Sequence, residues 1–151
     1  MVKCFAFVGC SAAKSAGESR SADERYASQL FEARRKYCEQ HGLEWFVLSS
    51  RFGLCADRQM VRDYDERLAS KNAIDFAAWH VAVVDQFLSL LSDGDKPKDI
   101  RVELHAGADY CEPLETILKS IGFEVVRPVR SLSIGKQLKF YADERAAVVS
   151  L

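Results

Sequence analysis

A thiol, a hydroxyl and an amine lie close together in the chain at Cys10, Ser11 and Lys14, directly after an apolar segment. An ammonium group near a thiol lowers the thiol pKa and so favours nucleophilic attack, and the same group can bind an anion. We therefore take Cys10 as a candidate nucleophile, and Ser11 and Lys14 as candidate ligands of a phosphate or a sugar. A turn of small residues with one solvated lysine would give the same pattern.

A second polar cluster follows the next apolar segment, at residues 49–53. Its hydroxyls and backbone N–H groups can surround a phosphate or a sugar, and its guanidinium group can bind an anion through two hydrogen bonds. The candidate binding residues are Ser49, Ser50, Arg51 and Gly53, with Tyr64 further along the chain. Two carboxylates beside that tyrosine, Asp65 and Glu66, are candidate acids or bases. A structural turn held by Arg51 and Asp65 is the alternative.

Two further clusters follow later apolar segments. His105 ends one such segment, and Gly107 and Tyr110 come directly after it. A histidine at this point titrates near neutrality and can act as an acid, a base or a donor, although a purely structural histidine is the alternative. The small residues let a ligand approach the backbone, and Tyr110 would contact a base. The last cluster, which would close the pocket, contains Ser133, Gly135 and Gln137.

Several well-known motifs are missing from the sequence. Neither GxGxxG nor GxxxxGK[ST] occurs, which excludes the usual dinucleotide and P-loop sites. Ser11 and Lys14 match the Ser-x-x-Lys of penicillin-binding enzymes, but the Ser-Asp-Asn and Lys-Thr-Gly partners of that motif do not occur. A zinc site is an alternative through residues that lack the paired spacing of such sites, namely Cys10, Cys55, His105 and Cys111. We therefore predict neither a metal nor another cofactor.

The 151-residue chain has a net charge of −1, with 21 Lys and Arg against 22 Asp and Glu. This balance supplies no overall field for nucleic acid or a membrane surface, so the binding of a polyanion would need a local basic patch. The five cysteines form no CxxC pair, which is typical of free thiols in a reducing compartment. No apolar segment approaches the ~20 residues of a membrane helix. These features predict a cytoplasmic protein without membrane association.

The elements that precede the polar clusters must position them. Apolar segments rich in β-branched and aromatic residues predict strands at 2–8, 44–48, 100–104 and 123–129, and helical periodicity predicts helices at 21–42, 72–92 and 110–121. This order predicts an α/β fold, a single-domain Rossmann-like three-layer sandwich over residues 1–151 with a mainly parallel sheet of about four to five strands. The clusters then converge outside the carboxyl ends of the strands, where such sheets bind ligands.

Three segments carry finer predictions. Residues 54–70 have no clear period, which indicates a structured loop with a short helical turn. In the helix at 72–92, a face that includes Ile74, Val81 and Leu88 predicts that the helix is mostly buried. Pro113 falls in the first turn of the helix at 110–121, where proline is tolerated. Residues 136–151 are expected to return along the surface as a helix or an added strand.

The motifs together resemble a small uncharacterised bacterial and phage domain family over nearly the whole chain. They are Cys-Ser-x-x-Lys at 10–14, Tyr-x-Ser-x-Leu-Phe at 26–31, Leu-Ser-x-x-Phe-Gly-Leu at 48–54, Tyr-Asp-x-x-Leu at 64–68, His-Ala-Gly-x-x-Tyr at 105–110 and Ile-Gly-x-Gln-Leu-x-x-Tyr at 134–141. The resemblance adds Tyr26 to the candidate binding residues. That family in turn resembles the YaaA-like superfamily, which includes a peroxide-stress protein with DNA-binding behaviour and is associated with 7-deazaguanine modification of DNA. This chain has Arg62-Asp63-Tyr64 where the superfamily commonly has Pro-Tyr.

The residues and the resemblance predict an enzyme that acts on a nucleotide or a modified nucleobase, free or in nucleic acid. The reaction would be transfer or hydrolysis at the base or its glycosidic bond. One alternative is a non-catalytic nucleic-acid-binding stress-response module, whose affinity would fall steeply with salt. The other is a nucleotide-sensing module of a phage-defence system, which a ligand would stabilise without forming product.

Overall fold

The computed structural model describes residues 2–9, 22–56 and 71–149, with the backbone alone for 22–28 and 148–149. The strands are β1 (Lys3–Gly9), β2 (Glu44–Ser49), β3 (Gly53–Ala56), β4 (Ile100–His105) and β5 (Glu124–Val126). The helices are α1 (Ala22–Gln40), α2 (Ala73–Leu90), α3 (Ala108–Ile121), α4 (Ile134–Val149) and the short 3₁₀ helix η2 (Pro97–Asp99).

The strands form one sheet in the order β3-β2-β1-β4-β5. β1 lies at the centre and pairs in parallel with both β2 and β4, and β5 pairs in parallel with β4. Only β3, among the strands of the described chain, runs antiparallel to its neighbour. The predicted α/β architecture with a mainly parallel sheet is therefore confirmed.

β3 corrects the expected loop at 54–70, because residues 53–56 form an edge strand that returns along β2. Gly53 has a φ of +79°, a left-handed conformation that permits the tight turn into β3. A Cβ at Gly53 would also collide with the Gln86 side chain of α2. Residues 57–70 lie outside the described part of the chain, and so does the short helical turn expected there.

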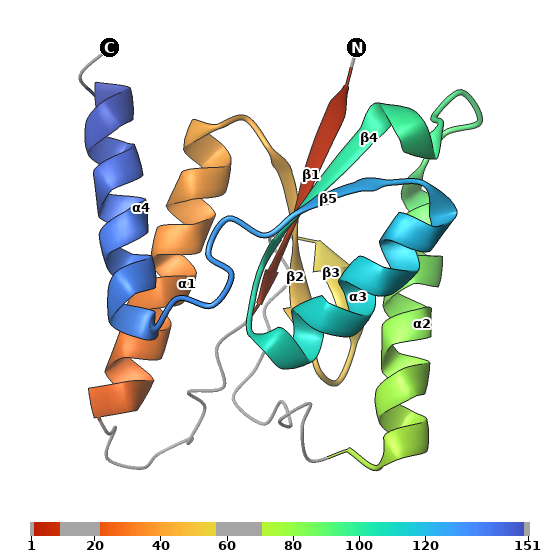
Figure 1. Ribbon diagram of the computed structural model, residues 1–151, viewed down its shortest axis with the longest axis horizontal. Coiled ribbons are helices and arrows are strands. Elements are labelled where there is room, and N and C mark those ends of the chain that lie inside the picture. Colours follow the sequence, from red (N-terminus) through yellow and green to blue (C-terminus); the bar gives the residue numbers. More distant parts are fainter. Residues whose placement is uncertain (1, 10–21, 57–70, 150–151) are drawn as a thin grey trace.

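The helices cover the two faces of the sheet, with α1 and α4 on one face and α2 and α3 on the other (Figure 1). Alternate residues of the central strand supply the two cores: Phe5 and Phe7 pack with α2 and α3, whereas Ala6 and Val8 pack toward α1. This is the three-layer sandwich expected from the order of the elements.

The prediction that α2 is mostly buried is wrong. Its buried side chains belong to one stripe that contains Trp79, His80, Val83, Val84 and Phe87. The face expected to be buried contains Ile74, Val81 and Leu88, whose exposed fractions are 81%, 60% and 38%. In the described part of the chain, α2 is the one helix long and apolar enough to cross a membrane by those two criteria, which the core helices of globular proteins also satisfy.

The C-terminal segment, expected as a helix or a strand, forms α4. The hydroxyl of Ser133 accepts a hydrogen bond from the Lys136 N–H at 3.3 Å, so Ser133 acts as the N-cap. α4 then packs on α1 through a cluster that contains Leu30, Ala33 and Tyr141. At the other end of α1, Gly42 has a φ of +66° and ends the helix as predicted.

Candidate functional site

The parallel strands end where the helices begin, at the lower edge of the molecule in Figure 1. We call this the carboxyl edge, defined by Gly9 of β1, residues 49–51 after β2 and residues 105–107 after β4. The chain leaves β1 toward β2 over one face of the sheet, whereas β4 lies on the other side of β1 and is reached through α2 on the opposite face. The strand order therefore reverses between β1 and β4, and such a switch point is where open α/β sheets bind ligands.

The ends of β1 and β4 approach each other closely at this switch point. A Cβ added to Gly9 would lie 2.7 Å from the Cβ of Ala106 and 3.1 Å from its Cα, so no larger residue fits between the two backbones. By contrast, a Cβ at Gly107 would meet no atom within 4 Å. Gly107 is the N-cap of α3, and no described side chain caps that helix. Within the described chain, the first turn of α3 therefore has no side-chain cap, and its N–H groups lie at the positive end of the helix dipole.

Arg34 of α1 fixes the carboxyl end of β1 through a hydrogen bond to its backbone. Its guanidinium donates through Nη1 to the Gly9 carbonyl at 3.1 Å and through Nη2 to Oε1 of Gln137 at 3.1 Å. The Gln137 amide in turn donates to the Leu132 carbonyl at 2.9 Å. Since Arg34 is almost fully buried, this charged side chain joins α1, β1 and the start of α4 in one polar network.

A second buried network lies beside the first, on the same face of the sheet. His105 is completely buried, with Nε2 at 3.0 Å from Oε1 of Glu103 and Nδ1 at 2.7 Å from the hydroxyl of Tyr141. The Glu103 carboxylate can only accept, so Nε2 carries the proton and Nδ1 accepts from the Tyr141 hydroxyl. The sequence predicted His105 as an accessible acid or base, whereas the structure makes it the middle member of a carboxylate–imidazole–phenol chain.

The ionisation of this chain follows from its burial. Burial lowers the pKa of His105, although Glu103 acts against this shift, so the imidazole is neutral. Burial raises the pKa of Glu103, but the hydrogen bond with His105 and the charge of Arg101 outweigh burial and bring the pKa below its usual value. The pKa of the Tyr141 hydroxyl is raised, mainly by burial. The network therefore contains one buried carboxylate charge, and Tyr37 covers it with its ring centroid 5.0 Å from that of His105.

The turn after β2 is built by Ser49. Its Oγ accepts hydrogen bonds from the N–H groups of Arg51 at 3.2 Å and Phe52 at 3.0 Å, and its carbonyl accepts from Nε1 of Trp79 at 2.8 Å. Arg51 is exposed and lies over the Phe52 ring, 5.3 Å from its centroid. Ser49 is thus engaged in the turn itself, and Arg51 is exposed at the carboxyl edge.

A cross-link between α2 and α3 fixes the start of α3. Pro113 lies inside α3 rather than in its first turn, because the helix begins at Ala108 instead of Tyr110. Proline has no N–H to donate to the carbonyl four residues earlier, that of Asp109. Nε2 of His80 lies 2.9 Å from this carbonyl, and Nδ1 lies 2.8 Å from the Phe76 carbonyl of its own helix. A neutral imidazole donates from one nitrogen, and the Phe76 carbonyl already faces the helix N–H four residues later, so we assign the proton to Nε2, which supplies the donor missing at Asp109. Tyr110 packs beside it, with its ring centroid 5.3 Å from that of Trp79.

The structure brings together part of the predicted site. The residues that it places at or beside the carboxyl edge are Ser49, Ser50, Arg51, Gly53, His105, Gly107 and Tyr110, with Ser133, Gly135 and Gln137 at the start of α4. Cys10, Ser11, Lys14, Tyr64, Asp65 and Glu66 lie outside the described residues, and Tyr26 belongs to the part of α1 described by its backbone alone. The sequence reasoning missed Arg34, Glu103 and Tyr37, and it treated Tyr141 only as part of a motif. Glu103 alternates with apolar residues in its strand, a pattern typical of a solvent-facing side chain, so the sequence carried no clear signal for this network.

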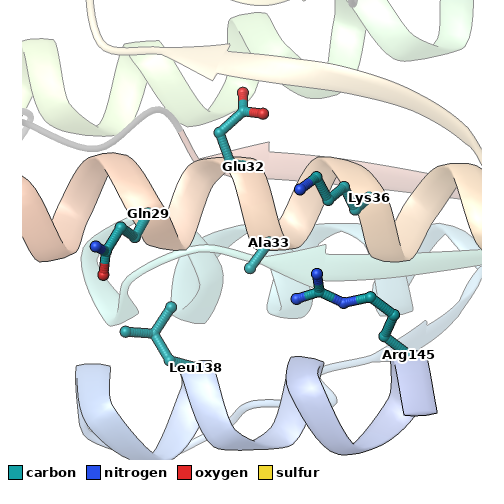
Figure 2. A pocket seen from close by; sticks show the side chains of 6 residues that line it. All are labelled: Gln29, Glu32, Ala33, Lys36, Leu138 and Arg145. Atoms are coloured by element: carbon teal, nitrogen blue, oxygen red, sulfur yellow. The ribbon is translucent and has the colours of Figure 1, made fainter. Parts of the chain in front are cut away.

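A separate groove of about 390 Å³ lies between α1 and α4. Its lining residues are Gln29, Glu32, Ala33, Lys36, Leu138 and Arg145. Figure 2 shows Leu138 pointing toward α1 and the Arg145 guanidinium lying between the two helices. None of the predicted site residues whose side chains are described lines this groove. Among the described residues there is also no group of three metal-ligating side chains, and the Cys111 thiol instead donates to the Ala106 carbonyl at 3.3 Å.

Comparison with known proteins gives one match. A model described as a family of unknown function (DUF6884) matches residues 5–143, and no curated protein or solved structure matches. The matched region extends from β1 into α4, so it contains the switch point between β1 and β4, Arg34 and the Glu103–His105–Tyr141 chain. The chain therefore belongs to the DUF6884 family.

Proposed function

We propose that the protein is an enzyme that binds a nucleotide or a modified nucleobase at the carboxyl edge. The reaction is transfer or hydrolysis at the base or its glycosidic bond. The observation that carries the proposal is the start of α3 at the switch point between β1 and β4, where no described side chain caps the helix and no described atom lies within 4 Å of a Cβ placed on Gly107. Backbone N–H groups without a described side-chain cap, at the positive end of a helix dipole, suit a phosphate or another anionic group.

The surroundings of α3 suit the rest of such a ligand. Asp109 is exposed in the first turn of α3, where its carboxylate can accept hydrogen bonds from ribose hydroxyls or from the amino groups of a base. Tyr110 follows it and offers an aromatic ring for contact with a base. A site that combines an anion position, a carboxylate and an aromatic ring suits a nucleotide better than it suits a simple phosphate.

The chemistry of the proposed reaction falls to predicted residues that lie outside the described part of the chain. Cys10 follows Gly9 directly in the chain and is the candidate nucleophile, with Ser11 and Lys14 as phosphate or sugar ligands. Asp65 and Glu66 are the candidate acids or bases, because His105 is buried and supports the site from below. The motif resemblance to the YaaA-like superfamily, with its link to 7-deazaguanine modification, extends the proposed substrates to deazaguanines.

Thermal unfolding of the purified chain with nucleosides, nucleotides, ribose phosphates and 7-deazaguanines tests the proposal, because a ligand of the native state raises the melting temperature. Gly107→Asp is the decisive variant. Its carboxylate caps α3 and so raises the melting temperature of the free protein, while it repels an anionic ligand and removes the ligand-induced shift. Gly94→Asp adds the same charge in an open loop and keeps the shift.

The outcomes separate the candidate functions. A ligand-induced shift that Gly107→Asp abolishes, together with product formation that Cys10→Ser abolishes, supports the enzyme. A shift that persists in Gly107→Asp assigns the ligand to another site and overturns the proposal. A shift that is lost in Gly107→Asp, with no product, identifies the nucleotide-sensing module instead.

A further inference from the structure

The groove between α1 and α4 is separate from the carboxyl edge and has a chemistry of its own. It has a volume of about 390 Å³ and extends over residues 29–36 of α1 and 138–145 of α4, which is about two helical turns or roughly 10 Å. The two helices lie side by side and run in the same direction (Figure 1). A hollow of this size fits a small organic molecule. We call it the α1–α4 groove.

The two ends of the α1–α4 groove differ in chemistry. At one end, Figure 2 shows the ammonium group of Lys36 and the guanidinium group of Arg145, one from each helix. At the other end lie Leu138 and Gln29, whose amide points toward α4. Ala33 lies between the two ends, and its small side chain leaves space in the middle of the groove. The groove therefore has a cationic end, an apolar floor and an end that offers both apolar contact and hydrogen bonds.

One carboxylate, that of Glu32, also lines the groove, but it is engaged elsewhere. Figure 2 shows this carboxylate on the side of α1 that faces away from α4. Its Oε2 lies 2.8 Å from Nη2 of Arg35, a residue that does not line the groove. Glu32 therefore does not occupy the space between the two cations.

The other carboxylates on the described side chains of α1 and α4 also have partners outside the groove. The pairs are Glu39 with Arg35 at 3.0 Å, Asp143 with Lys139 at 2.8 Å, and Glu144 with His41 at 3.7 Å. Within the described chain, by contrast, neither Lys36 nor Arg145 forms an ion pair. Two cations that face one hollow from different helices, with no carboxylate between them, favour an anion at that position.

The cationic end suits a phosphate ester. A guanidinium group donates two parallel hydrogen bonds to phosphate oxygens, and an ammonium group adds a compact charge with three donors. A phosphate monoester carries roughly 1.5 to 2 negative charges near neutral pH, which balances the two cations. Because Ala33 and Leu138 offer apolar contact beside the cations, an organic phosphate suits the groove better than inorganic phosphate.

We propose that the α1–α4 groove binds a small organic phosphate monoester. The phosphate lies between Lys36 and Arg145, and the organic body covers Ala33 and contacts Leu138. The Gln29 amide is available for a hydrogen bond with a polar group of that body. The ligand contacts both helices and so links α1 to α4 from the solvent side. This site does not depend on the ligand proposed at the carboxyl edge.

An NMR titration of the ¹⁵N-labelled chain with phenyl phosphate tests the proposal, because this probe combines a phosphate with an apolar ring. The largest changes in amide chemical shift are expected within residues 29–36 and 138–145. Inorganic phosphate at the same ionic strength is expected to bind about tenfold more weakly, since it lacks the apolar ring. The amides of residues 107–110 report binding at the carboxyl edge in the same spectra, so failure at one site is distinguished from failure at the other.

Three variants test the role of the two cations. Lys36→Gln and Arg145→Gln each remove a charged donor from the groove and should weaken the binding of phenyl phosphate by more than about tenfold. Lys139→Gln removes the same charge from α4 at an exposed residue that pairs with Asp143 outside the groove, and should change the affinity by less than about twofold.

Three results would overturn the proposal. The first is a set of shift changes that leaves out residues 29–36 and 138–145. The second is equal affinity for phenyl phosphate and inorganic phosphate, which would show that the apolar floor is not used. The third is an equal loss of affinity in Lys139→Gln and Arg145→Gln, which would assign the binding to the general charge of α4.

Discussion

His80, whose Nδ1 lies 2.8 Å from the Phe76 carbonyl in its own helix α2, uses Nε2 to donate to the backbone carbonyl of Asp109 in the first turn of α3, at 2.9 Å. The carbonyl is available because Pro113, four residues later, has no N–H. This hydrogen bond joins the two helices on one face of the sheet at the point where α3 begins, beside the candidate site. A proline inside a helix thus creates the acceptor for a tertiary contact.

His80→Phe keeps a ring of similar size but removes the donor, so the Asp109 carbonyl loses its partner. We expect the free energy of unfolding to fall by about 1–3 kcal/mol. Pro113→Ala supplies an N–H inside α3 that can reach the same carbonyl, so His80→Phe should cost about 1 kcal/mol less in that background. Urea unfolding of the four chains measures this coupling. An equal cost in both backgrounds would show that the two donors do not compete for the carbonyl.

Two adjacent arginines should differ sharply in their effect on stability. Arg34 is buried between Gly9 and Gln137, whereas Arg35 pairs with Glu32 and Glu39 at the surface of α1. Arg34→Lys loses the forked geometry that reaches both acceptors and should lower the free energy of unfolding by about 1–3 kcal/mol. Arg35→Lys keeps a surface ion pair and should change it by less than about 0.5 kcal/mol. Chemical denaturation of both variants measures the two changes. Equal losses in the free energy of unfolding would contradict the buried role of Arg34.

The buried Glu103–His105 pair predicts that acid destabilises the fold. The pKa of His105 lies below its ordinary value of 6.5, so between these two values the unfolded chain binds a proton that the native chain does not. Stability is therefore present above about pH 6.5 and falls as the pH drops, by up to about 1.4 kcal/mol per pH unit for one proton. The pKa of Glu103 is also lowered. Below its ordinary value of 4.5 the unfolded chain therefore binds a proton before the native chain does, so stability falls further as the pH drops.

His105→Gln removes the first of these titrations. Denaturation between pH 7 and pH 5 should show a smaller loss of stability in this variant than in the wild-type chain. The Gln variant is less stable at pH 7, since it loses the geometry that joins Glu103 to Tyr141. An unchanged pH dependence would assign the acid sensitivity to other groups.

Gly9→Ala should open the junction between β1 and β4. The added Cβ meets the Ala106 Cβ at 2.7 Å, and a backbone atom lies almost as near, so relief requires the strands to separate. We expect a loss of about 1–3 kcal/mol in the free energy of unfolding. Gly94→Ala, where a Cβ meets nothing within 4 Å, should stay within about 0.5 kcal/mol of the wild-type chain. Similar melting temperatures for the two variants would contradict the close approach.

The order of strands and helices could be predicted from the sequence because each element has a clear period and a clear end. β3 could not, since it has only four residues, and its pairing depends on a turn held by Ser49 and by Gln86 from a distant helix. The orientation of α2 was assigned wrongly because apolar residues surround this helix. The helical spacing of the apolar residues in α2 therefore does not decide whether the stripe that contains Val81 or the stripe that contains Phe87 faces the sheet.

The parts of the candidate site that come directly after a strand could be predicted from the sequence, whereas the parts that depend on tertiary packing could not. His105 and Gly107 were identified from their position after a strand. Arg34 and Glu103 were not, because an arginine in a helix and a glutamate that alternates with apolar residues both read as solvent-facing. Only the cover that α1 and α4 provide over this face of the sheet turns them into buried partners.

The central position of β1 has a consequence for synthesis on the ribosome. Lys3 pairs with Ile100, so one edge of the innermost strand has no partner until nearly two thirds of the chain has been made. During that time the nascent chain holds an apolar strand, paired only with β2, whose open edge can associate with other chains. We therefore expect translation beyond β4, rather than the folding of any early segment, to decide how much of the newly made chain escapes aggregation.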